Sequence, residues 1–546
     1  MKFNHADLFE GLADAIGDRV AVACGTDRLT FAELDSRANR MAHHLEAAGV
    51  RPGEHVGIQL YNGVEYIATL LAALKIRAVP INVNYRYVEA ELRYLYRDSD
   101  IVALVYDVEF DERVAAVAGQ APALRHLIAV GAQGGVPGAA TGAVTGAVTG
   151  AVTGAVPYET ALAGSPAGRG FPPRSADDVY IIYTGGTTGL PKGVMWRTED
   201  LFMAFGGGNP MGEPHSRPEQ VIETARSSGA LAMMPATPLM HGAAQMGTFI
   251  GWWIGATIVY TRRFDPVDVL RAIERERVLS VTVTGDAMAR PLAEAIAAAP
   301  PGTYDLSSLA VIGSTGAILS GAVRDRLREL LPAVRVMDNF GSTESGFTAA
   351  GVEGAAPESG LRFRPLGERI AVLDESLRPV APGSGGIGQV AKRGHIAFGY
   401  YNDPGKTART FPVVDGERWL LTGDIATVEA DGTITVFGRG SQCVNTGGEK
   451  VYPEEVEAVL KGHPGVFDAV VTGVPDERWG SRVAAVVQPY AGRAAPSAAD
   501  LDAHCRKSLA GYKVPRTYAF VDELVRSPAG KADYRWARRI AEEQAR

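Results

Sequence analysis

The chain has 546 residues, which is too long for one hydrophobic core, so we expect two or more domains. Hydrophobic residues make up 46% and charged residues 21%, as in ordinary globular proteins, and the net charge of −8 argues against a nucleic-acid-binding protein. The 3 cysteines lie far apart, which argues against structural zinc and indicates a reducing compartment. The N-terminus lacks the apolar core of a signal peptide, and the longest apolar stretch, residues 249–260, is too short to span a membrane. We therefore expect a cytoplasmic protein without transmembrane segments, whose only contact with lipids would be peripheral.

The N-terminal part of the chain alternates between helix and strand patterns. Thr30 can cap a helix, because Glu33 follows at capping-box spacing and apolar residues then recur at helical period. Strands are expected at residues 56–60, 78–82 and 101–105, and helices at residues 65–76 and 89–97. This alternation predicts an α/β layer built on a parallel sheet.

Residues 141–156 are consecutive Thr-Gly-Ala-Val units. A four-residue period matches no solenoid, and Gly/Ala-rich tracts lack the side chains that build a core. We therefore interpret this stretch as an expanded surface loop without function.

Residues 183–193, Tyr-Thr-Gly-Gly-Thr-Thr-Gly-Leu-Pro-Lys-Gly, lie between strand candidates at 179–182 and 194–196. Glycines let backbone N–H groups approach an anion, while threonine hydroxyls and a lysine add donors and charge, so the pattern favours a polyphosphate ligand. It is not a Walker A loop, because Leu190 and Pro191 separate Gly189 from Lys192. The alternative interpretation is a glycine-rich hairpin turn.

Several later segments place polar groups beside apolar ones. His241 follows an apolar stretch, and a lone histidine of this kind is more often structural than catalytic. Strands at residues 309–313 and 334–338 run into small or polar residues, and ligands of open α/β sheets bind at such carboxyl ends. Residues 383–388 match GxGxxG formally, but Ala381-Pro382 precedes them and a strand pattern follows, so we expect a hairpin turn.

The pattern of expected helices and strands changes near Arg439. Before it, a strand at residues 420–425 contains Asp424; after it, residues 452–460 form a helix opened by proline and two acids. Strands are expected at 469–474 and 483–487, so the C-terminal part is predicted to be a small α+β domain. Lys531 lies on a turn and, taken alone, is a surface lysine.

Taken in order, these segments resemble the adenylate-forming superfamily of acyl-CoA synthetases, adenylation domains and luciferases. The resemblance covers almost the whole chain and rests on the loop ending in Lys192, Pro238-Leu239-Met240-His241-Gly242, Phe340-Gly341-Ser342-Thr343-Glu344, Thr422-Gly423-Asp424, Gly438-Arg439, residues 447–457 and Gly530-Lys531. In the detail of individual segments, such as residues 183–197 and 438–457, the chain is similar to actinobacterial fatty-acyl and steroid side-chain CoA synthetases.

The resemblance implies an α/β fold with a large N-terminal adenylate-forming domain of layered sheets and a small, mobile α+β C-terminal domain. The N-terminal domain, which would bind AMP and the acyl group, would span residues 1–438 and include a flexible low-complexity loop at 131–157. Residues 439–442 would form a hinge, and residues 443–546 the mobile domain. The family usually carries Asp or Lys where this hinge has Gln442.

The implied first reaction joins a carboxylate to the α-phosphate of ATP and releases pyrophosphate. Glu344 would bind Mg²⁺, Thr343 would contact the α-phosphate, and Lys531 would stabilise the developing charge. The β- and γ-phosphates would be held by Thr184, Gly185, Gly186, Thr187, Thr188, Gly189 and Lys192.

The same resemblance places the adenosine moiety. Asp424 would accept hydrogen bonds from the ribose hydroxyls, with Arg439 close by. Phe340 would stack on the adenine, although the family usually has Tyr there. Asp338 or Asn339 would read the adenine amino group. The backbone of Gly316 and Ala317 would approach the ring.

In the implied second reaction, the acyl group passes to coenzyme A. Gly447 and Gly448 would line a narrow passage for pantetheine after the C-terminal domain rotates. His241 would border the acyl pocket, or else be a packed core histidine. Gly242, Phe249, Trp252 and residues 313–317 would complete that pocket, which favours a hydrophobic monocarboxylate.

Four functions remain open at this stage. The favoured one is an AMP-forming acyl-CoA ligase that uses a fatty or steroid side-chain acid, ATP, Mg²⁺ and coenzyme A. The alternatives are an adenylating enzyme that transfers the acyl group to a carrier protein, an aryl-acid CoA ligase, and a binding protein that has lost activity. The oligomeric state is not indicated by the sequence.

Overall fold

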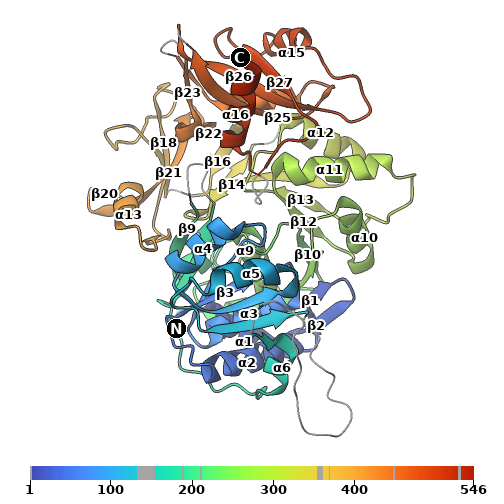
Figure 1. Cartoon of the computed structure of the whole chain (residues 1–546), viewed down its shortest axis with the longest axis vertical. Coiled ribbons are helices and arrows are strands. Elements are labelled where there is room, and N and C mark those ends of the chain that lie inside the picture. Colours follow the sequence, from blue (N-terminus) through green and yellow to red (C-terminus); the bar gives the residue numbers. More distant parts are fainter. Residues whose placement is uncertain are drawn as a thin grey trace. The chain divides into compact units, whose positions relative to one another are not determined.

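The computed structural model describes residues 3–131, 152, 154–185, 190–209, 212–352, 361–367, 369–446, 449–476, 478–526 and 531–545. The chain divides into two compact units (Figure 1). The first comprises Met1–Thr282, Gly302–Leu309 and His395–Ala408; the second comprises Val283–Pro301, Ala310–Gly394 and Arg409–Arg546. Helix α13 (Pro404–Thr410) crosses from one to the other along the chain.

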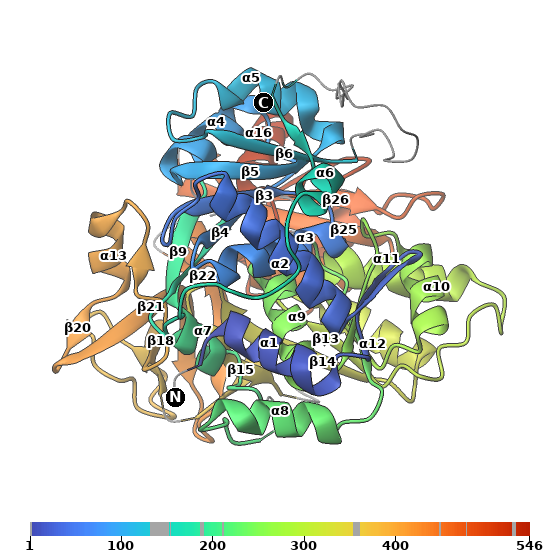
Figure 2. The same cartoon turned by 90° about the horizontal axis from the view of Figure 1, so that it is seen from below.

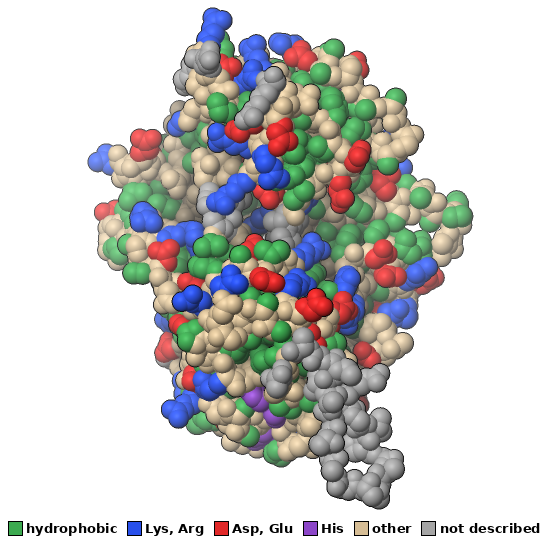
Figure 3. Space-filling model, in the orientation of Figure 1, with side chains coloured by type: hydrophobic (Ala, Val, Ile, Leu, Met, Phe, Trp, Pro, Cys, Tyr) green, Lys and Arg blue, Asp and Glu red, His purple; other side chains and the backbone are tan. Residues whose placement is uncertain are grey.

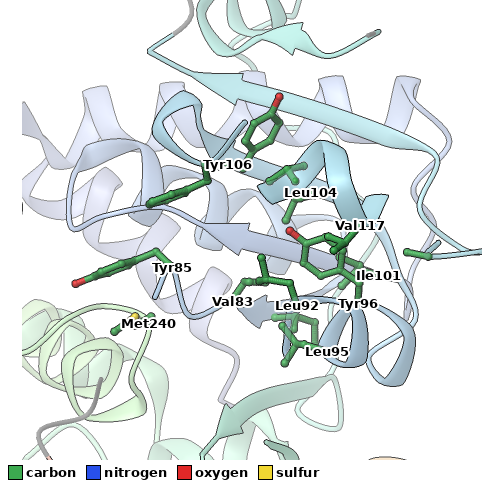
Figure 4. Packing of buried hydrophobic residues seen from close by; sticks show 14 of the residues in the cluster. Val83, Tyr85, Leu92, Leu95, Tyr96, Ile101, Leu104, Tyr106, Val117 and Met240 are labelled. Carbon is green, nitrogen blue, oxygen red and sulfur yellow. The ribbon is translucent and has the colours of Figure 1, made fainter. Parts of the chain in front are cut away.

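A five-stranded parallel sheet forms one layer of the first unit. Its order is β4 (Val79–Asn82), β3 (His55–Gln59), β5 (Ile101–Asp107), β6 (His126–Val130) and β7 (Val156–Pro157). Helix α4 (Glu89–Asp98) precedes β5, and helix α5 (Asp111–Ala118) follows β5 after the 3₁₀ turn Val108–Phe110; both helices pack against the core of this sheet. Figure 4 shows Leu92, Leu95 and Tyr96 packed with Ile101 and Leu104, so the alternating pattern of this region buries a shared apolar core.

The end of the repeat region belongs to this sheet, which corrects part of the loop prediction. Val156 pairs with Ile128 across β6 and β7, and Val152 and Ala155 are buried in the same core. The last repeats therefore supply small apolar side chains to the sheet. Most of residues 131–157 lie outside the described part of the chain, so the loop interpretation of the earlier repeats stays a prediction.

A second parallel group in the first unit has the order β12 (Ser280–Val283), β10 (Ala232–Pro235), β11 (Thr257–Tyr260) and β1 (Val20–Cys24), with β2 (Asp27–Thr30) antiparallel at its edge. Helices α1 (His5–Ile16), α2 (Phe31–Ala47) and α3 (Val64–Lys75) lie side by side (Figure 2). The remaining helices of this unit are α6 (Tyr158–Ala163), α7 (Thr198–Ala204), α8 (Pro218–Ser227), α9 (Gly242–Trp253) and α10 (Pro266–Glu276). The predicted capping box at Thr30 and Glu33 is confirmed at the start of α2.

The glycine-rich stretch connects two antiparallel strands. These are β8 (Val179–Thr184) and β9 (Lys192–Arg197), and β19 (Gly399–Tyr400) pairs with β9. The strands predicted on either side of the stretch are therefore confirmed.

The second unit begins with an antiparallel sheet. Its order is β17 (Ile370–Leu373), β18 (Ile387–Arg393), β21 (Glu417–Val428), β22 (Ile434–Arg439), β16 (Leu361–Pro365), β15 (Gly346–Gly351), β14 (Arg335–Ser342) and β13 (Val311–Ser314), with β20 (Val413–Val414) on β21. Among the described strand pairs of this particular sheet, β13 and β14 alone are parallel. Helices α11 (Gly285–Ala298) and α12 (Gly321–Leu330) belong to the same unit. The GxGxxG match runs into strand β18 rather than a helix, as predicted.

The C-terminal part of the second unit has its own sheet with a core on each face. The sheet consists of β25 (Val466–Asp476), β26 (Gly480–Pro489) and β27 (Thr517–Phe520). A separate hairpin is formed by β23 (Val444–Thr446) and β24 (Glu449–Val451). Val471 and Ala485 face the core with α14 (Pro453–Lys461) and α15 (Ala498–Cys505), whereas Val470 and Ala484 face the core with α16 (Tyr534–Ala545). Adjacent residues of a strand point to opposite faces, so both faces are covered and the predicted small α+β fold is confirmed.

No helix in the described part of the chain is long and apolar enough to cross a membrane. The apolar stretch at 249–260 is buried core, as expected. Figure 3 shows positive and negative side chains interspersed over the visible face.

Candidate active site

The base of the glycine-rich stretch is fixed by strand pairing. Thr184 pairs with Lys192 across β8 and β9, so both residues lie where the hairpin opens into the stretch. The Lys192 ammonium lies 6.0 Å from the centre of the Tyr400 ring. Gly193 has no room for a side chain, because a Cβ there would lie 2.8 Å from the ring of Tyr183. Gly185 leads away from β8; the predicted ligand residues Gly186, Thr187, Thr188 and Gly189 lie outside the described residues.

A buried amide joins this hairpin to the segment that contains His241. The side chain of Asn82 donates to the carbonyl of Tyr183 at 2.7 Å and to the carbonyl of Met240 at 2.6 Å, and accepts from the Tyr183 N–H at 2.7 Å. His241 is half-buried and immediately precedes α9. Sequence analysis missed Asn82, whose only signal is a polar residue at the end of a buried strand.

Two residues predicted to border the acyl pocket lie in the core instead. Phe249 and Trp252 are 2% and 1% exposed, which excludes a role in the wall of an open pocket. Trp252 donates from its indole to the carbonyl of Ala21 at 2.9 Å and packs against Phe9 at 4.7 Å between ring centres. This part of the prediction was wrong, because an apolar pattern does not distinguish a core-facing side chain from a pocket-facing one.

In the second unit, Asp424 and Arg439 are strand neighbours. They pair across β21 and β22, and Arg439 Nε lies 2.9 Å from Asp424 Oδ1. Arg439 also donates to the carbonyl of Thr422 at 2.8 Å, which fixes the guanidinium in place. Burial raises the pKa of the Asp424 carboxyl, and the Arg439 charge opposes that shift. The Asp424 carboxylate therefore lies beside a guanidinium that is itself fixed to the backbone.

Lys531 lies among the charged residues predicted to act with it. It is half-buried, and the loss of water around its ammonium lowers its pKa. The Arg439 charge adds to this decrease, while the carboxylates of Glu344 and Asp424 oppose it. The structure thus brings Lys531, Glu344, Asp424 and Arg439 together within one unit.

Thr343 and Glu344 are half-buried in the turn that joins β14 to β15. The turn is braced by Ser342 and Ser345, each of which donates its N–H to the other's hydroxyl, at 2.9 and 3.2 Å. Buried Lys392 donates to the carbonyl of Ser345 at 2.6 Å and to that of Phe347 at 2.7 Å. Burial lowers the pKa of Lys392 to about 8. Sequence analysis missed this lysine, because its partners are backbone groups distant in the sequence.

The residues predicted to contact adenine lie on β14 and on the turn after β13. Asp338 is buried, and Arg324 of α12 approaches its carboxylate to 3.3 Å. Burial raises the pKa of Asp338 to about 7, although Arg324 opposes the shift. Asn339 and Phe340 are half-buried, and the ring of Phe340 lies 5.2 Å from that of Phe363.

The turn after β13 is attached to the start of α11. Gly316 adopts φ +78°, a backbone conformation that favours glycine, and Ala317 follows it. The N–H of Ser320 donates to Asp286 Oδ1 at 2.8 Å, and the N–H of Asp286 donates to the carbonyl of Ile318 at 3.0 Å. Asp286 therefore fixes the turn that carries Gly316 and Ala317.

The predicted hinge region follows β22. Gln442 closes the 3₁₀ turn Gly440–Gln442, and the Arg439 N–H donates to Glu454 Oε1 at 3.3 Å. Burial raises the pKa of Glu454 to about 8, and the nearby Glu457 carboxylate adds to that shift. Gly447 and Gly448 lie outside the described residues, so their predicted role and the boundary at residues 439–442 stay predictions.

Residues 9–401 match the protein family described as AMP-binding enzyme, and residues 455–531 match the AMP-binding enzyme C-terminal domain. The chain therefore belongs to the AMP-binding enzyme family, the class to which its fold and the grouping around Lys531 point.

Relatives with similarity over the whole chain narrow this class further. The chain is 45% identical over 550 residues to the medium/long-chain-fatty-acid–CoA/3-oxocholest-4-en-26-oate–CoA ligase of Mycolicibacterium smegmatis, covering 100% of this chain and 97% of the relative. It is 44% identical over 544 residues to the 3-oxocholest-4-en-26-oate–CoA ligase of Rhodococcus rhodochrous, covering 98% and 96%. The predicted similarity to actinobacterial fatty-acyl and steroid CoA synthetases is confirmed.

The fold is also that of a solved enzyme structure. The anthranilate CoA ligase AuaEII, in complex with anthranoyl-AMP, matches with a TM-score of 0.83 at 24% sequence identity, over 100% of this chain and 98% of that chain. The predicted fold class, mixed α/β with a large N-terminal and a small C-terminal part, is confirmed.

Proposed function

We propose that this protein is an AMP-forming acyl-CoA synthetase. It would activate a hydrophobic carboxylic acid with ATP and transfer the acyl group to coenzyme A. The observation that carries the proposal is the position of Lys531 among Glu344, Asp424 and Arg439, because a cation placed there can serve a reaction between anions.

In the first half-reaction, a carboxylate oxygen attacks the α-phosphorus of ATP, and the bond from that phosphorus to the bridging oxygen of pyrophosphate breaks. Both reactants are negative, so positive charge must offset their repulsion. Lys531 supplies it at the new acyl–phosphate linkage, and Thr343 donates a hydrogen bond to the α-phosphate. Lys192 and the hydroxyls of the glycine-rich stretch hold the departing pyrophosphate.

The braced turn after β14 fits a magnesium site. Mg²⁺ is normally held by one or two carboxylates together with phosphate oxygens and water, so the single carboxylate of Glu344 is sufficient alongside ATP. A bound Mg²⁺ supplies charge neutralisation at the phosphates. In the described part of the chain, no group of three or more His, Cys, Asp or Glu side chains could hold a metal ion by itself. The proposed Mg²⁺ would therefore bind together with ATP.

The nucleoside would be held by the residues of the antiparallel sheet. Asp424, held by Arg439, accepts from the ribose hydroxyls, and Phe340 stacks on the adenine. Burial raises the pKa of Asp338 to about 7. Its carboxyl group can therefore accept a hydrogen bond from the edge of the base when ionised, and can donate one when protonated.

In the second half-reaction, the thiolate of coenzyme A attacks the acyl carbonyl and AMP leaves. Gly447 and Gly448 would line the approach of pantetheine after residues 443–546 rotate at the hinge. We place the enzyme in the cytoplasm, where ATP and coenzyme A are available.

The substrate we favour is a medium- or long-chain fatty acid or a steroid side-chain acid. The full-length relatives that are 44–45% identical are named for these acids. The alternatives are transfer to a carrier protein and activation of aryl acids. The matched anthranilate CoA ligase structure, at 24% identity, supports the fold alone.

The test is CoA-dependent release of AMP with a panel of fatty, steroid-derived and aryl acids. We expect AMP and acyl-CoA in equal amounts with fatty or steroid acids. AMP release that depends on the acid but gives no thioester would favour a different acceptor, and no AMP with any acid would refute the enzyme. Lys531→Ala should abolish acyl-adenylate formation; an unchanged rate would refute the role of Lys531.

A further inference from the structure

Lys531 lies next to a β-bridge between two residues of the C-terminal part of the chain. Arg526 and Ala532 form an isolated antiparallel bridge, and Lys531 is the neighbour of Ala532. The position of the Lys531 backbone is therefore tied to the position of Arg526.

The Arg526 side chain is held by a fork of two hydrogen bonds. Its Nε donates to Asp468 Oδ2 at 2.8 Å and its Nη2 donates to Asp468 Oδ1 at 2.7 Å. Asp468 is 6% exposed on β25, so the fork is shielded from water. Burial alone would raise the pKa of Asp468, but the charges of Lys461 and Arg526 hold it below its ordinary value. A fork of this kind fixes direction as well as distance.

The same carboxylate continues into a chain of alternating charges. Lys461, at the end of α14, lies 3.4 Å from Asp468 Oδ1 and 3.7 Å from Asp286 Oδ2 on α11. Lys461 and Asp286 are 6% and 5% exposed. Buried charges cost stability unless they are paired, so the order Asp286, Lys461, Asp468, Arg526 specifies one arrangement of these elements.

A second set of contacts on α11 supports the same attachment. Asp286, Arg290 and Glu294 are spaced by four residues and therefore share one face of the helix. Arg290 donates to the Tyr490 hydroxyl at 2.8 Å, and that hydroxyl donates to Glu294 at 3.4 Å. Tyr490 follows β26, so α11 is bound to the C-terminal sheet at a second point.

We propose that the ionic chain Asp286–Lys461–Asp468–Arg526 positions Lys531 against Glu344 and Asp424. Asp468 and Arg526 act through Lys531 and are positioning residues rather than catalytic ones. The chain ends on Asp286, which also fixes the turn carrying Gly316 and Ala317, so one set of contacts aligns the lysine with the nucleotide side of the site. This inference rests on the proposed function, because it assigns Lys531 to the first half-reaction.

The experiment compares Arg526→Gln, Arg526→Lys and Asp468→Asn in the full-length protein. The matched control is Asp502→Asn, which removes a charge from another Asp–Arg fork of the same C-terminal part, with Arg506 bonds of 2.5 and 3.1 Å at the surface. Acyl-adenylate formation is measured in single turnovers with dodecanoic acid. Thioester formation is measured separately from supplied dodecanoyl-adenylate and coenzyme A.

We expect Arg526→Gln and Asp468→Asn to slow acyl-adenylate formation by about 100-fold, the effect of a misplaced reacting group, while thioester formation stays within about twofold. Arg526→Lys keeps the charge but loses the fork, and should recover part of the rate. The control should match the wild type. Wild-type adenylation in both Arg526→Gln and Asp468→Asn would overturn the proposal, as would equal losses in both half-reactions, which indicate general destabilisation.

A measurement that does not depend on activity separates this proposal from the proposed function. Acetylation of Lys531 by acetic anhydride at fixed pH, followed by mass spectrometry, reports how well its side chain is shielded. We expect acetylation several-fold faster in Asp468→Asn than in the wild type or in Asp502→Asn, measured well below the unfolding temperature of each variant because loss of a buried charge lowers that temperature. If no acid gives AMP, the proposed function fails, and unchanged acetylation in Asp468→Asn overturns the positioning proposal independently.

Discussion

Asn82→Ala tests the largest energetic contribution that we assign to one side chain beside the glycine-rich stretch. The substitution removes two donated bonds and one accepted bond, and leaves the N–H of Tyr183 and the carbonyls of Tyr183 and Met240 without this partner. Tyr183 and Met240 are 4% and 1% exposed, so solvent does not replace the amide freely.

The expected loss follows from these three groups. Leaving a buried polar group unsatisfied costs about 1–3 kcal/mol, and neighbouring losses are not additive, so we expect a decrease of about 3–5 kcal/mol in the free energy of unfolding. The control is Asn209→Ala, whose amide donates one exposed bond of 3.0 Å to the Glu213 carbonyl, for which we expect about 1 kcal/mol or less.

Urea unfolding followed by tryptophan fluorescence measures both variants, because Trp196 and Trp252 lie in the same unit as Asn82. Asn82→Asp adds an internal check. Its ionised carboxylate can accept from the Tyr183 N–H but faces two carbonyl oxygens, so its deficit should shrink at acid pH, where the protonated form can donate. A loss below about 1 kcal/mol in Asn82→Ala would refute this account of the amide.

Three further predictions concern other regions. Lys192→Ala should weaken ATP use in the first half-reaction and spare thioester formation from supplied acyl-adenylate; equal loss in both steps would contradict a leaving-group role. Burial raises the pKa of Glu454 from 4.5 to about 8, so the folded state retains a proton that the unfolded state releases, and stability falls as pH rises through this interval. Glu454→Gln should remove that fall, which urea titrations on both sides of the interval measure; an unchanged pH dependence would show that this carboxyl is not the cause. Deleting residues 141–148, which keeps buried Val152 and Ala155, should leave turnover and stability unchanged, and a folded variant without turnover would contradict the loop interpretation.

Much of the fold could be predicted because its signals are local. The capping box at Thr30 and Glu33 marks the start of α2, and the continuous apolar runs Ala469–Val471 in β25 and Val483–Val487 in β26 are typical of a sheet buried on both faces. Short-range patterns of this kind depend on period and capping, which are properties of the sequence itself.

The site was predicted less completely, because several of its supports join residues that are distant in the sequence. Asn82, Lys392 and Asp468 carry no motif, and each is recognisable only from the groups that it meets. Phe249 was misassigned for the opposite reason, since its apolar character fits both a core and a pocket. Resemblance to a family indicated candidate substrate-binding residues but not the residues that hold those candidates in place.

Gly438 lies at a point where the chain leaves no space for a side chain. It adopts φ +137°, and a Cβ at that position would collide with the carboxylate of Glu454. A single methyl group at residue 438 would therefore act as a wedge between the end of β22 and the start of α14. Gly438→Ala would therefore show, without a ligand or cross-link, how far the contact between these two elements depends on a residue that has no side chain.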